Sequence, residues 1–267
     1  MNPLLTIVTV CYNSEQTIRR CIDSVVKELN KNIEYLIIDG KSKDKTLDIV
    51  QEYNSNKIRY ISEKDNGIYD AMNKGVKMAN GKWIYFLNSD DSLKENVLEK
   101  VLKILRDSKY DCVYGDFEEI LEYNGQLYSR EVRANKKIDE IKRGMIFSHQ
   151  SFFAKKELIL ECGLFDISFR IAGDWDLISK LYKKGYKFYH INEMIVNFYL
   201  GGASGKNHNL ERHRVRKKNK LYKYIDVYFI RDMFYSCRSK VYKSIVRNDY
   251  NSRRLKQYKL KGYSYNL

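Results

Sequence analysis

The sequence lacks three patterns that mark common protein classes. Its five cysteines are odd in number and include no Cys-x-x-Cys pair, which argues against a disulfide framework or a zinc site and favours reduced thiols. No run of about 18 apolar residues occurs, so we expect no helix that spans a bilayer. The first residues carry no basic segment ahead of an apolar one, so we expect no secretory signal. These absences predict a cytoplasmic protein.

Net positive charge is almost missing from the first three quarters of the chain. The 267 residues carry a formal net charge of +15. Residues 205–267 contain 18 Lys and Arg against four acidic residues, a net of +14, which leaves +1 for residues 1–204. Because the hydrophobic content of 43% is ordinary, a sizeable core is available. We predict a folded domain over 1–204 and a basic helical extension over 205–267.

Strand and helix patterns alternate along the first half of the chain. Four apolar, β-branched runs have the length of buried strands: 4–10, 34–38, 58–61 and 82–87. Helical patterns separate them, with Ser14 in the position of a helix N-cap. Such alternation predicts an α/β fold with a mostly parallel central sheet and helices on both faces.

The second half of the domain has a different pattern. Residues 116–132 predict an antiparallel hairpin with Asn124-Gly125 at its turn. A further helix is expected over 174–184 and an extended segment over 188–199. We therefore divide the domain at about residue 115, into halves of 1–115 and 116–204.

Carboxylates follow two of the predicted strands. Asp39 ends the second strand, and Asp90 and Asp91 follow the fourth. Since ligands of parallel sheets bind at the carboxyl ends of the strands, these side chains should share one edge. Adjacent carboxylates repel each other, and a hard cation such as Mg²⁺ or Mn²⁺ relieves the repulsion. The alternatives are that Asp90-Asp91-Ser92 caps a helix beginning near Lys94, and that backbone amides satisfy Asp39.

Four ordered segments resemble the motifs of glycosyltransferase family 2, whose members have the GT-A fold. They are Thr9-Val10-Cys11-Tyr12-Asn13, Ile37-Ile38-Asp39-Gly40-Lys41-Ser42-Lys43-Asp44, the stretch 63–75, and Leu87-Asn88-Ser89-Asp90-Asp91. The resemblance covers about residues 4–204, and residues 65–75 are similar to a branch acting on bacterial surface polysaccharides. It implies inverting transfer of a sugar from a nucleotide-diphosphate sugar.

The resemblance assigns roles at the donor end. Donor-binding positions are implied at Thr9, Tyr12, Asp39, Asp65, Lys74 and Asp90. Asp39 would accept a hydrogen bond from the base, which suits uracil or thymine and hence a UDP-sugar. Asp91, with Asp90, would bind Mn²⁺ or Mg²⁺. Family members often have Asp-x-Asp-Asp here, but this chain has Asn88 in the first place, which leaves the division of duties between Asp90 and Asp91 open.

The resemblance also implies the catalytic base. Members often carry Glu-Asp-x-Asp-Leu at a helix start, and this chain has Gly173-Asp174-Trp175-Asp176-Leu177. Asp174 matches the base, which removes the proton of the acceptor hydroxyl, and Asp176 is the second choice. The alternative for Asp174 is a helix cap.

Two further side chains are candidates for contact with the acceptor or the diphosphate. They are His149 and Trp175. The alternative for each is a structural role, His149 as a satisfied buried histidine and Trp175 as part of the wall or core.

The basic extension leaves three interpretations. Residues 206–261 mix Lys and Arg with apolar residues at helical spacing, which is compatible with an anionic membrane surface, with packing on the domain or in a homodimer, or with nucleic acid. The family resemblance disfavours nucleic acid, because it implies a glycan or polyprenyl-linked acceptor at the inner face of the cell membrane.

Two other functions would also suit an α/β protein with carboxylates at the edge of its sheet, and the residues present disfavour both. An inactive nucleotide-sugar-binding relative is disfavoured because Asp39, Asp90, Asp91 and Asp174 are all present. A sugar-1-phosphate nucleotidyltransferase would carry a glycine-rich loop after the first strand, where this chain has Cys11-Tyr12-Asn13-Ser14.

Overall fold

The structure is a computed structural model that describes residues 2–53, 58–106, 109–201, 209–222 and 224–234, and the backbone of 259–260. The strands are β1 (Leu5–Cys11), β2 (Ile33–Asp39), β3 (Ile58–Ser62), β4 (Trp83–Phe86), β5 (Ser92–Leu93), β6 (Cys112–Tyr123), β7 (Gln126–Val132), β8 (Phe152–Lys155), β9 (Phe188–Tyr199) and β10 (Lys259–Leu260). The helices are α1 (Ile18–Val26), α2 (Thr46–Glu52), α3 (Ile68–Met78), α4 (Val97–Arg106), α5 (Lys156–Glu161), α6 (Gly173–Lys183) and α7 (Asn209–Lys218), with short 3-10 turns at Ile138–Lys142 and His149–Ser151. Residues 227–234 are also helical.

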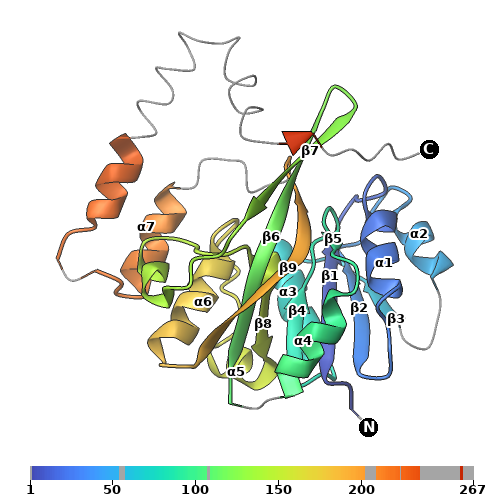
Figure 1. Ribbon diagram of the computed structural model, residues 1–267, viewed down its shortest axis with the longest axis horizontal. Coiled ribbons are helices and arrows are strands. Elements are labelled where there is room, and N and C mark those ends of the chain that lie inside the picture. The colour runs from blue at the N-terminus through green and yellow to red at the C-terminus, as the bar shows by residue number, and fades with distance from the viewer. Residues whose placement is uncertain are drawn as a thin grey trace.

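All ten described strands belong to one sheet with helices on both faces (Figure 1). The strand order is β10-β7-β6-β8-β4-β1-β2-β3, and β9 pairs with β6 and β5. The β3-β2-β1-β4 part is parallel, as expected from the alternating pattern. The strands β5, β7, β8 and β10 pair antiparallel, which makes the whole sheet mixed. The predicted hairpin is confirmed, with Tyr123 opposite Gln126.

The core has two layers, one on each face of the sheet. Successive residues of a strand point to opposite faces, so the unbroken apolar runs supply both layers. In β1, Leu5 and Ile7 pack into the layer that contains α1 and α4, whereas Val8 and Val10 pack into the layer that contains α3 and α6. Every residue of β1 and β2 is buried, which fixes the strand ends where the polar motifs begin.

Two local expectations about helix starts are wrong. The first helix begins at Ile18, and Ser14 contributes its carbonyl oxygen to the N–H groups of Thr17 and Ile18 instead of capping with its side chain. Asp90 and Asp91 do not cap a helix either, because α4 begins only at Val97 and the intervening β5 pairs with β9. The capping interpretation of the carboxylate pair is therefore excluded.

The start of the predicted extension packs against the domain. In α7, Glu211 accepts hydrogen bonds of 2.9 Å from the backbone N–H groups of residues 170–172. Lys218, at the other end of α7, contacts the fully buried Asp176 of α6 at 2.9 Å. The predicted boundary between residues 204 and 205 therefore stays a prediction. The helix α7, which follows that boundary, contacts α6 and the residues before it. Most of the amphipathic pattern beyond residue 234 lies outside the described residues.

No helix in the described part of the chain combines the length and the apolar character that crossing a membrane requires.

Candidate active site

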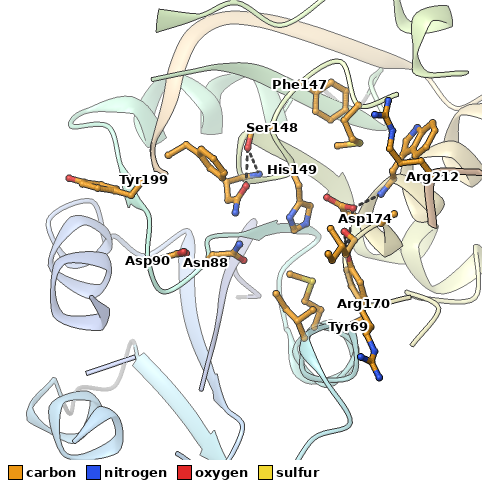
Figure 2. Close-up of a pocket in the computed structure, with 18 residues that line it drawn as sticks. Tyr69, Asn88, Asp90, Phe147, Ser148, His149, Arg170, Asp174, Tyr199 and Arg212 are labelled. Carbon is orange, nitrogen blue, oxygen red and sulfur yellow. Dashed lines mark hydrogen bonds between the residues drawn. The ribbon is translucent and has the colours of Figure 1, made fainter. Parts of the chain in front are cut away.

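A cavity of about 490 Å³ opens at the carboxyl edge of the parallel strands. Its wall combines segments that are far apart in the sequence (Figure 2). The contributing parts are the turn after β4, the first residues of α3, the segment 145–150, residues 170–175 at the start of α6, the end of β9, and Arg212 of α7. Of the predicted site residues, the cavity brings together Asp90, His149, Asp174 and Trp175.

The turn after β4 carries the polar groups at one end of the cavity. The N–H of Asp91 donates to the carbonyl oxygen of Asn88 at 3.1 Å, which closes the turn. Asn88 and Asp90 line the cavity, whereas Asp91 is fully buried behind them and accepts a 2.8 Å hydrogen bond from the N–H of Tyr199. Burial raises the pKa of Asp90, and burial together with the charge of Asp90 raises the pKa of Asp91. The turn therefore holds two carboxyl groups whose charges are poorly compensated.

This turn fits a hard divalent cation. Asn88 Oδ1 and Asp91 Oδ2 are buried and have no hydrogen-bond partner among the described residues. Oxygen donors of this kind suit Mg²⁺ or Mn²⁺, which typically take one or two carboxylates from the protein and complete their shell with water and substrate phosphates. Accordingly, no group of three or more His, Cys, Asp or Glu in the described ranges is placed to hold a metal. Asp90 lines the cavity, whereas the unpartnered carboxylate oxygen belongs to Asp91, so the geometry keeps both as candidate ligands, as the sequence did.

The other predicted donor residues do not line this cavity. Thr9, Tyr12 and Asp39 belong to β1 and β2 or follow them directly, Asp65 follows β3, and Lys74 lies in α3. Tyr12, 56% exposed, and Asp65 meet over Gly40. A Cβ at Gly40 would lie 2.4 Å from Asp65 Oδ2 and 3.4 Å from the Tyr12 ring, so a larger residue there would require the Asp65 carboxylate to move. Lys74 contacts Glu63 at 2.9 Å and the carbonyl oxygen of residue 64 at 2.8 Å.

Asp39 and Thr9 are interior residues. Both are fully buried. The Asp39 carboxylate accepts hydrogen bonds from the N–H of Ser42 at 3.1 Å and from the hydroxyl of Ser62 at 2.6 Å. Thr9 Oγ1 accepts a 3.0 Å bond from the Tyr35 hydroxyl. Backbone and hydroxyl groups therefore satisfy the Asp39 carboxylate, which agrees with the alternative of a structural role for Asp39.

Asp174 projects into the cavity from the first turn of α6. Its Oδ1 accepts a 2.7 Å hydrogen bond from the N–H of Trp175 and lies 3.4 Å from the Tyr69 hydroxyl. That hydroxyl donates to the carbonyl oxygen of Ile171 at 2.5 Å, which ties α3 to the start of α6. A Cβ at Gly173 would lie 2.7 Å from the Tyr69 ring, which explains why glycine stands where many members have glutamate.

Asp176 has a structural environment. It is fully buried and contacts Lys180 and Lys218 at 2.9 Å and Asn219 Nδ2 at 2.7 Å. It does not line the cavity. The structure therefore favours Asp174 over Asp176 for contact with a substrate.

His149 occupies the middle of the cavity wall. Its ring stacks on Phe86 with centroids 5.6 Å apart, and its Nε2 has no hydrogen-bond partner among the described residues. Burial lowers the pKa of His149, although the charge of Asp174 raises it. Figure 2 shows His149 between Asn88 and Asp174.

Trp175 forms part of the cavity wall and is almost fully buried. Its Nε1 donates to the carbonyl oxygen of Ile141 at 2.8 Å. These contacts agree with the wall or core alternative more than with a sugar platform.

Sequence reasoning missed three residues that build the site. Arg20 of α1 donates a 2.6 Å hydrogen bond to the carbonyl oxygen of Asp90, and its Cζ lies 3.5 Å from the centroid of the Tyr199 ring. Tyr199 and Arg212 both line the cavity. Nothing in the sequence signals these contacts, because each joins segments that are distant in the chain, such as Arg20 with Asp90 or Arg212 with Trp175.

The fold and the arrangement of the site define a nucleotide-sugar transferase of GT-A type. The family model "Glycosyl transferase family 2" matches residues 6–166, and the chain belongs to this family. It is 32% identical to chondroitin synthase of Escherichia coli over 81% of this chain, but spans only 31% of that protein. It is 30% identical to a PGL/p-HBAD biosynthesis glycosyltransferase of Mycobacterium bovis (strain BCG / Pasteur 1173P2), over 76% of this chain and 79% of that protein.

Solved structures have the same fold. S. aureus TarS 1-349 in complex with UDP-GlcNAc superimposes with a TM-score of 0.66 at 18% identity, covering 81% of this chain and 65% of that one. The mannosyltransferase PcManGT from Pyrobaculum calidifontis, in complex with GDP-Man and Mn²⁺, gives 0.60 at 16% identity, covering 86% and 67%. The predicted GT-A fold is therefore confirmed, with a sheet that is mixed rather than mostly parallel, while the basic helical extension over 205–267 stays a prediction.

Proposed function

We propose that the protein is a metal-dependent, inverting glycosyltransferase that moves a hexosyl or N-acetylhexosaminyl group from a UDP-sugar to a glycan or polyprenyl-linked acceptor in surface-polysaccharide synthesis. One observation carries the proposal: a single cavity joins the Asn88–Asp90 turn at one end to Asp174 at the other. The nucleotide sugar bound by TarS and the Mn²⁺ and GDP-Man bound by PcManGT support a nucleotide-sugar donor and a metal.

The donor is proposed to lie along the ends of β1, β2 and β4. Tyr12 and Asp65 meet there over Gly40 and, together with Lys74 of α3, would contact the nucleotide. Asp39 would orient the base only if Ser42 or Ser62 released its hydrogen bond to the buried carboxylate. Asp90, with the Asn88 amide oxygen, would hold Mg²⁺ or Mn²⁺, and Asp91 would support the turn from behind. The metal would stabilise the charge of the departing nucleoside diphosphate.

The acceptor is proposed to enter beside α6. The Asp174 carboxylate takes the proton of the acceptor hydroxyl as that oxygen attacks the anomeric carbon from the side opposite the diphosphate, which inverts the configuration. Trp175 N–H fixes one oxygen of the carboxylate at 2.7 Å, which leaves the other for the acceptor. His149 would hydrogen-bond the transferred sugar or the acceptor through its unpartnered Nε2.

A screen of nucleotide sugars tests the proposal. UDP with Mn²⁺ or Mg²⁺ should raise the melting temperature, chelator should weaken that effect, and one UDP-sugar should be hydrolysed or transferred. Equal stabilisation by GDP would contradict the uridine assignment, and indifference to chelator would contradict the metal. Binding without any turnover across the panel would support an inactive relative.

We also propose that the basic region from residue 206 to residue 261 holds the enzyme at an anionic membrane surface. Within the described part of this region, Ile225 and Ile230 are 67% and 59% exposed, and Arg231 adjoins them. Exposed apolar side chains beside cations suit an anionic lipid surface. The alternatives that the sequence left open, packing on the domain and a homodimer, are outcomes of the vesicle test given below.

A further inference from the structure

Buried charges connect α7 to the helical residues 227–234. Arg216 is fully buried and donates from Nε to Asp226 at 2.7 Å and from Nη2 to Asp232 at 3.4 Å. Asp226 also contacts His213 Nδ1 at 2.8 Å. Burial raises the pKa of Asp226, but the hydrogen bonds from Arg216 and His213 outweigh that and hold the pKa below its usual range. The charge of the Asp226 carboxylate is thus balanced by hydrogen bonds from Arg216 and His213.

The second carboxylate of this cluster, that of Asp232, has more cationic neighbours than its single charge can balance. Asp232 is contacted by three guanidinium groups, from Arg216 at 3.4 Å, Arg231 at 3.3 Å and Arg212 at 3.6 Å. Three arginines face two carboxylates, Asp226 and Asp232. The cluster therefore carries a surplus positive charge.

Arg212 is the member of this cluster that lines the cavity. Its side chain is 28% exposed and lines the cavity, with Cζ 5.9 Å from the Trp175 ring centroid. Burial lowers the pKa of Arg212, and the charges of Arg216 and Arg231 lower it further against the opposite effect of Asp232. Besides the 3.6 Å contact with Asp232, its Nη2 donates to the carbonyl oxygen of Arg143 at 3.4 Å.

Arg212 is consequently a guanidinium with long, weak contacts in a partly buried setting. A guanidinium has five N–H donors in a planar fork, and that fork matches a carboxylate or phosphate with two parallel hydrogen bonds. Figure 2 shows Asp174 between His149 and Arg212 in the cavity, so an anion on Arg212 would lie on the acceptor side of the base.

We propose that Arg212 forms an anion subsite beside Asp174 that binds an acidic group of the acceptor, either a sugar carboxylate or a phosphate. The inference rests on the proposed function, because it places the acceptor at Asp174. It adds the chemical class of the acceptor, which the motifs do not indicate.

The test compares three probes that differ only at one carbon: a p-nitrophenyl glucoside, the corresponding glucuronide and the 6-phosphate of the glucoside. Dissociation constants are measured by calorimetric titration into the full chain, first with UDP and Mn²⁺ present and then without them. We expect one acidic probe to bind at least about 10-fold more tightly than the neutral one, the effect of a charge-assisted hydrogen bond. The preferred probe identifies the anion as carboxylate or phosphate.

The Arg212→Gln variant should lose this preference, and Arg212→Lys should keep part of it. Arg214→Gln is the matched control, because Arg214 lies on the same helix, contacts Phe169 and Ser168, and does not line the cavity. The proposal is overturned if wild type prefers neither acidic probe, or if Arg212→Gln retains the full preference. Loss of UDP binding with an intact anion preference would instead count against the proposed donor.

Discussion

The two ends of the cavity are built in different ways. The proposed donor end is the turn after β4, and the register of β1 with β2 and β4 places the turns after β1 and β2 at the same edge of the sheet, outside the cavity. The acceptor end is assembled from remote segments, such as Tyr69 with Ile171 and Glu211 with residues 170–172. The donor end thus follows from local sequence and strand order, whereas the acceptor end depends on individual long-range contacts.

The buried carboxyl groups of the two regions also differ, in the direction in which their pKa values are shifted. At the donor end, burial raises the pKa of Asp90 and Asp91 without a strong partner. Around α7, burial also raises the pKa of Asp166 and Glu211, but hydrogen bonds from Lys218 and from backbone N–H groups hold both below their usual ranges. The comparison indicates that carboxylates with cationic or several backbone partners hold the segments around α7 together, whereas Asp90 and Asp91 lack a cationic partner strong enough to offset their burial and are candidates for contact with a ligand.

The largest expected effect separates the two aspartates of α6. Asp174→Asn should lower transfer by at least about 10²-fold, the usual contribution of a positioned base, in initial-rate assays with a saturating donor. Asp176→Asn should reduce the melting temperature instead, because it removes the charge that pairs with Lys180 and Lys218. Near wild-type transfer by Asp174→Asn with an inactive but folded Asp176→Asn would reverse the assignment.

The next effect concerns the two carboxylates of the donor turn. Asp90→Asn should raise the Mn²⁺ concentration needed for half-maximal rate by about 10-fold or more, since Asp90 faces the cavity. Asp91→Asn should change it less, because an amide oxygen can still accept from the Tyr199 N–H. A larger change for Asp91→Asn would make Asp91 the main metal ligand.

A third variant tests whether buried ion pairs hold α7 in place. Arg216→Met removes the fully buried guanidinium from Asp226, which keeps only His213 as a side-chain partner, and leaves Asp232 to Arg212 and Arg231. Loss of one partner of a buried ion pair should cost up to about 3–5 kcal/mol of unfolding free energy in urea titrations. The exposed Arg214→Gln should stay within about 0.5 kcal/mol of wild type. If the two variants unfold at the same urea concentration, α7 is not anchored by this cluster.

The smallest effect per residue is expected at the basic region. Attraction of a Lys or Arg to anionic lipid is worth about 1 kcal/mol and is screened by salt. The full chain should co-sediment with anionic but not zwitterionic vesicles and be released by added salt. Replacement of Ile225 and Ile230 by serine should weaken this binding. If the full chain ignores anionic vesicles while these changes split a dimer, the surface belongs to a subunit contact.

The positions of the strands along the chain and the donor motifs could be predicted from the sequence, because apolar periodicity and turn residues are local properties. The helix containing Asp174 and the 116–132 hairpin were predicted for the same reason. The order of the strands in the sheet was not predicted, because it depends on pairing between distant segments. The sequence could not show that Asp91 is buried behind Asp90, because one residue decides which side chain faces the cavity. Nor could it place Arg212, which reaches the cavity only because Glu211 and Arg216 fix the rotation of α7.

The central claim is that one end of the cavity binds the donor and the other end binds the acceptor. The most direct test is calorimetric titration of UDP with Mn²⁺ into wild type, Asp174→Asn and Asp90→Asn. The account predicts that Asp174→Asn binds UDP within about twofold of wild type although it fails in transfer, whereas Asp90→Asn binds at least about 10-fold more weakly. If Asp174→Asn loses UDP binding to the same extent as Asp90→Asn, the division into a donor end and an acceptor end is wrong.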